Sequence, residues 1–323
     1  MLINKSFCRL VSSLMLLMIV LLPCSVFAEA DPQRADVYYE RGYAYYFEGQ
    51  YDLAIMNYSK SIELNPQYAN AYCNRGIAYK SKGQYDLAIS DYNKAIELNP
   101  QYAVAYINRG NAYNSKGQYD VAIIDYNKAV ELNPQYASTY YNRGIAYNSK
   151  GQYDIAIMDY NKAIELNPQY ANAYCNRGIA YKSKGQYDLA ISDYNKAIEL
   201  NPKFADAYNN RGNAYNLKNQ YDVSIADYNK VIELNPKYAV AYYNRGDAHA
   251  YKGQYDLAIA DYDKTIELNP LNADAYYKRA LVFKKIGWIS KAIESYKLFL
   301  QYAPSTAPDI ELVKQTIKAL GGN

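Results

Sequence analysis

The sequence predicts an all-α solenoid, a stack of helical hairpins joined by short turns. The string Asn-Arg-Gly recurs at steps of 34 residues from Asn74 to Asn244. The string Glu-Leu-Asn-Pro recurs with the same step from Glu63 to Glu267. A fixed period in this range is typical of stacked repeats, not of one globular core. No segment shows the alternation of apolar and polar residues that indicates a strand.

The N-terminal 28 residues have the layout of a secretory signal peptide. Lys5 and Arg9 precede an apolar stretch over 10–22, and small residues at Val26 and Ala28 suit a cleavage site. The stretch is shorter than the ~20 residues that a membrane-spanning helix needs. We therefore expect cleavage after Ala28, an exported protein in the periplasm or outside the cell, and no membrane span in the mature chain. The alternative is an uncleaved N-terminal segment that tethers the protein to the membrane.

Eight repeats follow a short lead-in at 29–34. Their boundaries are 35–68, 69–102, 103–136, 137–170, 171–204, 205–238, 239–272 and 273–306. The second and fifth repeats differ only at Gln101/Lys203 and Tyr102/Phe204, which indicates duplication of a block of three repeats. Positions within a repeat are numbered from its first residue, so that Ala35 and Ala69 both stand at position 1.

Each repeat is predicted to form two helices. In the second repeat the first helix runs from about Ala69 to Lys82, and Gly83 suits the left-handed conformation that ends a helix. Asn219, the next-best residue for that conformation, replaces this glycine in the sixth repeat. The second helix starts near Asp86 and ends before Pro100, because proline disfavours helix at the residue before it.

The segment at 307–323 is predicted to hold a capping helix and a short tail. Residues 309–320 are amphipathic, because four apolar side chains recur on one side: Ile310, Val313, Ile317 and Leu320. The eighth repeat departs from the pattern of the others, with Ala280 and Phe283 in place of the usual Gly and Tyr. Terminal repeats differ in this way because they face a cap and not another repeat.

The small and aromatic residues of each repeat form a recognisable set. In the second repeat they are Tyr72, Gly76, Tyr79, Ala88, Ala95 and Pro100. This pattern resembles the tetratricopeptide repeat, with Tyr at position 4 where the family often has Trp. The resemblance covers 35–306 and suggests an exported bacterial member with eight repeats. It implies a right-handed superhelix in which the first helices line a concave groove that holds peptides or proteins.

Composition excludes several classes of function. The 35 Lys and Arg residues nearly balance 32 Asp and Glu, a net charge of +3, so binding to nucleic acid through bulk charge is not expected. A single histidine, His249, cannot form a shared metal site and is predicted to fill the core. No phosphate-binding loop and no pair of nucleophile and base is recognisable. We expect no metal, no cofactor and no enzymatic activity.

The candidate ligand residues lie on the first helices. Most of the 42 tyrosines occupy packing positions, but Tyr39, Tyr141, Tyr243 and Tyr277 share position 5, for which the sequence offers no packing role. Rigid amphipathic aromatics are favoured at recognition surfaces. Asparagines form a second stripe, whose amides suit a peptide backbone or a sugar; the alternative is an ordinary solvated face. This stripe consists of Asn74, Asn108, Asn142, Asn176, Asn210 and Asn244 at position 6, with Asn111 and Asn213 at position 9.

Two further sets of residues have structural interpretations. Every repeat has Arg at position 7, and six have Asp at position 23, which favours an ion pair within the repeat. The alternative is that the arginines reach the groove as a track for anions. Cys73 and Cys175 are three repeats apart, too far for a disulfide, and are predicted to be free thiols that act as small apolar groups.

These observations predict a non-enzymatic scaffold for protein–protein interaction, whose groove holds an extended peptide or a segment of a partner. The alternative is a structural component of a cell-envelope machine for polysaccharide export or pilus assembly, in which the same groove contacts glycan.

Overall fold

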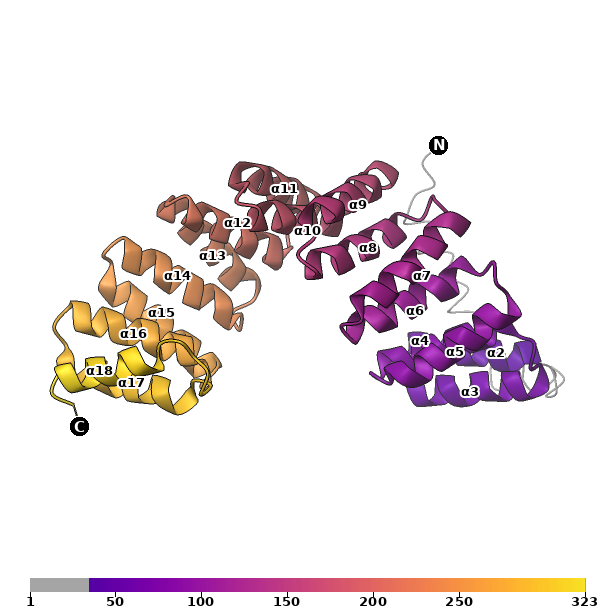
Figure 1. Ribbon diagram of the computed structural model, residues 1–323, viewed down its shortest axis with the longest axis horizontal. Coiled ribbons are helices and arrows are strands. Elements are labelled where there is room, and N and C mark those ends of the chain that lie inside the picture. The colour runs from indigo at the N-terminus through magenta and orange to yellow at the C-terminus, as the bar shows by residue number, and fades with distance from the viewer. Residues whose placement is uncertain (1–34, 323) are drawn as a thin grey trace. The chain divides into compact units, whose positions relative to one another are not determined.

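A computed structural model describes residues 35–322 (Figure 1). The predicted signal peptide, the lead-in and Asn323 lie outside the described residues. Every regular element in the described range is an α-helix, and the helices form tandem hairpins, which confirms the predicted α-solenoid. Among residues 35–322, no helix combines the length and the apolar character that crossing a bilayer requires.

The chain divides into two compact parts, which meet in sequence between Lys150 and Gly151. The first part contains α2 (Ala35–Phe47), α3 (Tyr51–Leu64), α4 (Ala69–Ser81), α5 (Tyr85–Leu98), α6 (Ala103–Ser115), α7 (Tyr119–Leu132) and α8 (Ala137–Ser149). The second contains α9 (Tyr153–Leu166), α10 (Ala171–Ser183), α11 (Tyr187–Leu200), α12 (Ala205–Leu217), α13 (Tyr221–Leu234), α14 (Ala239–Tyr251), α15 (Tyr255–Leu268), α16 (Ala273–Lys285), α17 (Ile289–Tyr302) and α18 (Ile310–Ala319).

Within each part the first helices of successive repeats approach one another. In the first part α2 contacts α4, α4 contacts α6 and α6 contacts α8; in the second part α10, α12, α14 and α16 follow the same rule. For the second helices of the repeats, no such contact is present between neighbours in the described residues. The first helices therefore line the inner side of each stack, and the second helices line its outer side.

In three hairpins of each part, a glycine of the first helix lies against a tyrosine ring of the second helix. The ring of Tyr92 on α5 is fully buried against Gly76 on α4. A Cβ atom on Gly76 would lie 2.7 Å from Cε1 of Tyr92, closer than side chains approach. Gly178 and Tyr194 repeat this geometry at the same 2.7 Å. Position 8 must be small because the aromatic ring of position 24 lies directly on the backbone there.

The turn between the two helices uses a left-handed residue, as predicted. Gly83 has φ +73°, and Asn219, its equivalent in the sixth repeat, has φ 59°. Both residues follow a lysine at position 14, whose backbone N–H closes the last turn of the first helix. The geometry of the turn is thus set locally, by the one residue that tolerates a positive φ.

A ladder of ion pairs joins successive turns. The lysine at position 14 binds the aspartate at position 18 of the preceding repeat, which lies in the first turn of a second helix. The pairs are Lys82–Asp52, Lys116–Asp86, Lys150–Asp120, Lys184–Asp154, Lys218–Asp188 and Lys252–Asp222. The aspartate is largely exposed in every pair, so each contributes little to stability but favours one register of neighbouring repeats.

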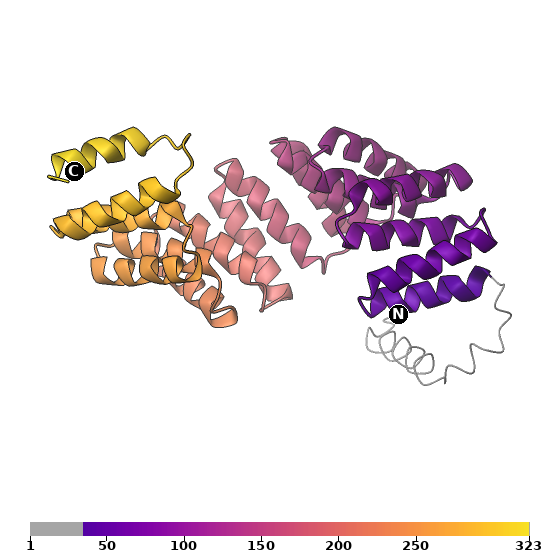
Figure 2. The ribbon, with the colours of Figure 1, turned by 90° about the horizontal axis from the view of Figure 1, so that it is seen from below.

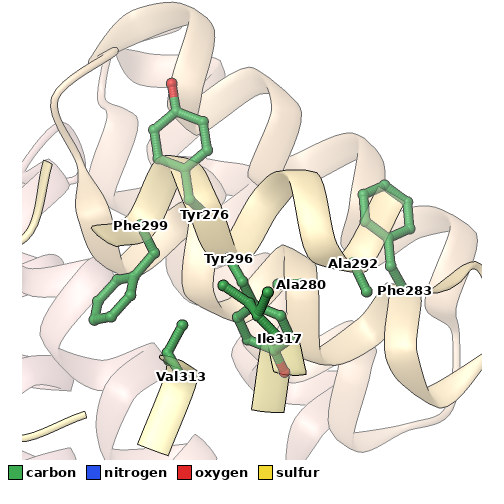
Figure 3. Close-up of a cluster of buried hydrophobic side chains, with 8 residues drawn as sticks. All are labelled: Tyr276, Ala280, Phe283, Ala292, Tyr296, Phe299, Val313 and Ile317. Atoms are coloured by element: carbon green, nitrogen blue, oxygen red, sulfur yellow. The ribbon is translucent and has the colours of Figure 1, made fainter. Parts of the chain in front are cut away.

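The helix α18 covers the last hairpin (Figures 2 and 3). Its Val313 and Ile317 are buried in one cluster with Tyr296 and Phe299 of α17. Phe299 stands where the other repeats have a smaller side chain, so the end of the stack presents a larger apolar surface than an internal junction. The amphipathic face of α18 removes this surface from water.

We predict that Gly178→Ala lowers the free energy of unfolding by about 1–3 kcal/mol, since the added methyl group overpacks the contact with Tyr194. Asn172→Ala is the matched control, because Asn172 is exposed on the same helix; its effect should stay within about 0.5 kcal/mol. Urea denaturation measures both. Equal stability of Gly178→Ala and the native protein would contradict the close contact.

We also predict that Val313→Asn destabilises the cap by about 1–3 kcal/mol, because an amide without a partner would replace a buried side chain. Loosening of α18 would expose Tyr296 and Phe299, so light scattering should rise on heating. Leu312→Asn changes the neighbouring residue, whose side chain is 54% exposed, and should leave scattering and melting temperature unchanged. Identical behaviour of the two variants would argue against the capping role.

Candidate functional site

The arginine at position 7 is the polar centre of each repeat. In the second repeat, Nε and Nη2 of Arg75 donate to the two carboxylate oxygens of Asp91 at 2.8 and 2.7 Å. Its Nη1 donates to Oγ of Ser59 in the preceding repeat at 3.0 Å. The same bidentate pair is present in Arg109–Asp125, Arg177–Asp193, Arg211–Asp227 and Arg245–Asp261. The predicted ion pair within the repeat is therefore confirmed in these five repeats.

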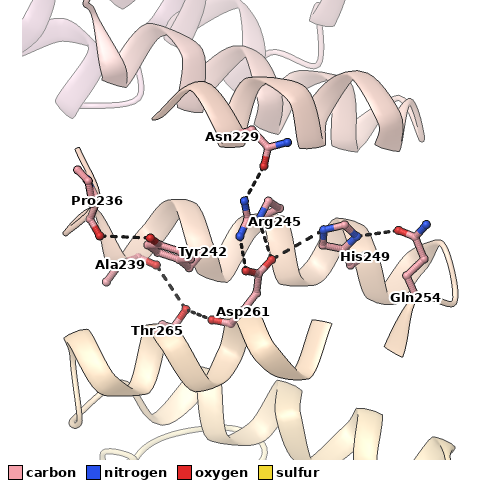
Figure 4. Close-up of polar contacts among 9 residues, drawn as sticks. All are labelled: Asn229, Pro236, Ala239, Tyr242, Arg245, His249, Gln254, Asp261 and Thr265. Atoms are coloured by element: carbon pink, nitrogen blue, oxygen red, sulfur yellow. Dashed lines mark hydrogen bonds and ion pairs between the residues drawn. The ribbon is translucent and has the colours of Figure 1, made fainter. Parts of the chain in front are cut away.

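This geometry is incompatible with a track for anions. In Figure 4, the guanidinium of Arg245 donates to Asp261 and to Oδ1 of Asn229, both of which lie on second helices. The hydrogen bond to Asp227 raises the pKa of Arg211. With its donors directed at protein acceptors, the arginine connects two second helices and does not face the inner side of the stack.

His249 lies beside this centre in the seventh repeat. Its Nδ1 is 2.7 Å from Oε1 of Gln254, and its Nε2 is 3.9 Å from a carboxylate oxygen of Asp261 (Figure 4). Only 12% of the side chain is exposed, as expected of a residue that fills the core. In the part of the chain that the structure describes, no three His, Cys, Asp or Glu side chains gather where they could hold a metal ion.

The tyrosines at position 5 have packing contacts that the sequence analysis missed. The ring of Tyr39 lies 5.0 Å from that of Tyr68 and 5.8 Å from that of Tyr58. Tyr277 lies 5.2 Å from Phe299, and Tyr243 lies 6.1 Å from the ring of Tyr262. All three are half-buried, and Tyr141 is half-buried as well. The expectation that position 5 lacks a packing role is thus wrong for Tyr39, Tyr243 and Tyr277.

Other residues at position 5 are buried outright. Cys73 is fully buried, Cys175 is 3% exposed and Asn209 is 7% exposed. Both cysteines are free thiols, as predicted, and burial raises the pKa of Cys73 to about 11. Position 5 therefore points partly into the junction between repeats, and only the larger tyrosine side chains reach past it.

The asparagines at position 6 are half-buried, and several connect neighbouring repeats. Nδ2 of Asn74 donates to the hydroxyl of Tyr39 at 2.8 Å, and Nδ2 of Asn244 donates to Oδ1 of Asn209 at 3.0 Å. Asn108 instead donates to the backbone carbonyl of Val104 at 3.0 Å. Asn142, Asn176 and Asn210 are half-buried on the same face. The stripe is present on the inner side, with part of its hydrogen-bonding capacity used within the protein.

Position 9 decides whether the buried tyrosine of position 24 has a partner. The hydroxyl of Tyr126 donates to Oδ1 of Asn111 at 2.8 Å, and that of Tyr228 donates to Oδ1 of Asn213 at 2.7 Å. The second and fifth repeats have isoleucine at position 9, and there the hydroxyls of Tyr92 and Tyr194 have no partner among the described residues. Asn111 and Asn213 thus use their oxygen internally, while their NH2 groups donate to no other side chain or backbone group among the described residues.

Two lysines on the inner side complete the site, and sequence reasoning missed their importance. Lys80 and Lys182 stand at position 12 of the duplicated repeats, and burial lowers the pKa of both. Neither has a carboxylate partner within residues 35–322. Acidic residues on other first helices of the described range do not pair with the two lysines. Instead Asp247 pairs with Lys278 at 3.4 Å, and Asp206 accepts from the hydroxyl of Tyr238 at 2.8 Å.

The lysines lie next to the asparagine stripe. Nζ of Lys182 is 3.4 Å from Oδ1 of Asn210, a residue of the next repeat. Lys80 and Asn108 stand at the equivalent positions of the second and third repeats. Each compact part therefore holds one copy of the same group on its inner side: Lys80, Asn108 and Asn111 in the first, and Lys182, Asn210 and Asn213 in the second.

Family models of the tetratricopeptide repeat match along the chain. One, described as TPR repeat, matches residues 42–83, 110–151, 146–185, 212–253 and 246–287. Others, described as tetratricopeptide repeat, match 69–102 and 171–204, 91–123 and 193–222, and 273–306. A search of curated proteins finds no match.

Two of the solved structures to which this chain is similar, the first two described below, share its fold. A tetratricopeptide repeat protein from Parabacteroides merdae is 22% identical with a TM-score of 0.61, over 79% of this chain and 100% of that chain. The Cut9–Hcn1 hetero-tetramer of the APC/C contains a chain that is 18% identical with a TM-score of 0.63, over 91% of this chain and 58% of that chain. YrrB, described as a TPR protein with an unusual peptide-binding site, is 30% identical with a TM-score of 0.47, over 57% of this chain and 95% of that chain.

The ion pair is tested by a double-mutant cycle on Arg211 and Asp227. Arg211→Leu alone should cost about 1–3 kcal/mol of unfolding free energy, because it leaves a buried carboxylate unpaired. Adding Asp227→Ala should recover much of this loss. The exposed pair Lys230–Glu233 is the control and should couple by less than about 0.5 kcal/mol. Additive losses at Arg211 and Asp227 would mean that the two side chains do not stabilise each other.

Stability should fall in alkaline solution. Burial raises the pKa of Tyr39, Tyr238 and Tyr296 from 10.0 to about 12 in the folded protein. Since the unfolded chain loses these protons first, their contribution is complete below pH 10.0 and is lost as the pH rises toward about 12. Urea denaturation at a series of pH values should show this decline. Tyr296→Phe should make it shallower, and a profile that stays flat above pH 10.0 would contradict the prediction.

Proposed function

This chain belongs to the tetratricopeptide repeat family, and from that premise we propose that it is a non-enzymatic scaffold for protein–protein interaction. The inner side of each stack holds an extended segment of a partner protein. The observation that carries this proposal is the group of one lysine and two asparagines that recurs once in each compact part.

The asparagine pair of the third repeat suits a peptide backbone. Asn108 gives a side-chain N–H to Val104, which leaves its carbonyl oxygen to accept from a ligand. Asn111 accepts from Tyr126, which leaves its NH2 group to donate. The two residues are three positions apart on one helix, so they share a face. An acceptor and a donor held side by side match the N–H and C=O groups of an extended chain.

The lysines add a preference for an acidic group. Removal of water from Lys80 and Lys182 lowers the pKa of each ammonium, which means that the charged form is held at a cost. A carboxylate on the ligand would relieve that cost and form a charge-assisted hydrogen bond. The preferred segment therefore carries an acidic side chain or a terminal carboxylate next to backbone that the asparagines can bind.

We predict that acidic peptides selected from a random library bind this protein through the two lysines. Lys80→Gln combined with Lys182→Gln should weaken binding by about 1.5–3 kcal/mol for each site engaged, the range for a hydrogen bond to a charged group. Lys94→Gln with Lys196→Gln is the matched control, since these lysines lie in the same repeats on second helices and pair with Glu97 and Glu199.

Equal loss in the control pair would indicate attraction by overall charge and would contradict a defined site.

The tyrosines at position 5 remain predicted ligand residues. Tyr141→Phe and Tyr243→Phe test them better than substitution by alanine, because the ring of Tyr243 also packs on Tyr262. Crosslinking of the protein in its native envelope, followed by mass spectrometry, would identify the partner. Saturable binding of glycans but of no peptide would overturn the proposal.

We propose further that the scaffold acts after export. This proposal is supported by the order of residues 1–28, in which a basic region comes first, an apolar stretch follows, and small residues suited to cleavage come last. The mature protein should begin at Glu29 and be recovered in the periplasm or the medium, and mass spectrometry of its N-terminal peptide measures this directly. Recovery of the uncleaved chain in the membrane fraction would favour the tethered alternative.

A further inference from the structure

The ladder of ion pairs between turns is incomplete at one junction. In the six earlier junctions, a lysine at position 14 binds the aspartate at position 18 of the preceding repeat. Between the seventh and eighth repeats that lysine is replaced by Ile286. Its counterpart Asp256 is exposed and has no cationic partner among residues 35–322.

A complete junction shows how the lysine is accommodated. A surface pocket of about 270 Å³ between the turns of the fourth and fifth repeats is lined by Asp154, Ile155 and Lys184. The Lys184 side chain is only 29% exposed, whereas Asp154 is 80% exposed. The half-buried stem of the lysine therefore forms one wall of the pocket, and its ammonium reaches the carboxylate of Asp154.

The incomplete junction has a larger pocket, and isoleucine and tryptophan line it where a complete junction has the lysine. Its volume is about 420 Å³, and Asp256, Leu257, Ile286 and Trp288 line it. Ile286 is shorter than lysine, and Trp288 stands where the other repeats have glutamine. Gln254, which also lines the pocket, has its amide oxygen 2.7 Å from His249 (Figure 4).

The indole of Trp288 is held in place and remains partly accessible. It stacks on Phe283 with ring centroids 5.7 Å apart, and Nζ of Lys291 lies 4.2 Å from its ring centroid. Even so, 45% of the Trp288 surface is exposed. Lys291 forms no ion pair in the described part of the chain, so it does not neutralise the carboxylate of Asp256.

We propose that this pocket binds the side chain of a lysine from a partner protein or peptide. The methylene groups lie against Ile286 and Trp288, and the ammonium pairs with Asp256. The ligand thus takes the place that an internal lysine occupies at every earlier junction. The site uses none of the residues on the inner side of the stack, and its failure would leave the proposed scaffold function untouched.

The test uses Trp288, which is the only tryptophan of the chain, as the reporter. The indole N–H resonance is followed by NMR during titration with Nα-acetyl-lysine amide. Two control compounds are the norleucine analogue, which keeps the stem without the ammonium, and the Nε-acetylated lysine analogue. We expect a saturable shift with the lysine compound alone. Equal shifts with all three compounds, or no saturable shift with any, would overturn the proposal.

Three variants separate a specific pocket from attraction by surface charge. Asp256→Asn should weaken binding of the lysine compound about fivefold, the upper end for an exposed ion pair. Ile286→Lys supplies the missing internal lysine and should abolish binding. Asp154→Asn alters the equivalent carboxylate, which Lys184 already occupies, and should change nothing. Unchanged binding in Asp256→Asn or Ile286→Lys, or a loss in Asp154→Asn equal to that in Asp256→Asn, would overturn it.

Discussion

The close contact between a tyrosine ring and a glycine backbone is the constraint on which the rest of this structure depends. With Tyr92 fully buried against Gly76, α4 and α5 cannot separate or slide without opening a cavity or a clash. The same contact recurs in three hairpins of each compact part, so these hairpins have nearly the same internal geometry. Identical hairpins stack by one repeated operation, which is why a residue at a given position faces the same surroundings in each internal repeat.

The arginine at position 7 converts this stack of apolar contacts into one with a defined register. Arg109 reaches Asp125 in its own repeat and Asn93 in the preceding one, so a shift of one repeat against its neighbour would break charge-assisted hydrogen bonds. A buried ion pair of this kind adds little net stability, because removal of two charges from water offsets their attraction. Its contribution is to favour one arrangement over others of similar apolar burial.

Where a described repeat departs from the common pattern, polar or charged side chains are left without the partner that they have in other repeats. Ile77 in place of asparagine leaves the hydroxyl of Tyr92 without a described partner, and Lys80 adds a cation on the same inner side. Ile286 in place of lysine leaves Asp256 beside an accessible indole. In an array of near-identical repeats, the complete junctions serve as internal references, so a missing partner can be recognised by comparison with its neighbours.

The sequence by itself determined the class of fold, the helices and the turns, because each follows from local signals: the 34-residue period, the Gly or Asn that ends each first helix, and the proline after each second helix. It also predicted the pairing of Arg211 with Asp227, since positions 7 and 23 lie on the two facing helices of one repeat.

Only the tertiary structure decided what position 5 does. The ring of Tyr277 packs on Phe299 and Cys73 is fully buried, since this position lies at the junction of two repeats. The tertiary structure also decided that Lys80 is partly buried without an acidic partner in the described part of the chain. The sequence gives the overall balance of charges, but burial and pairing depend on which side chains meet in space.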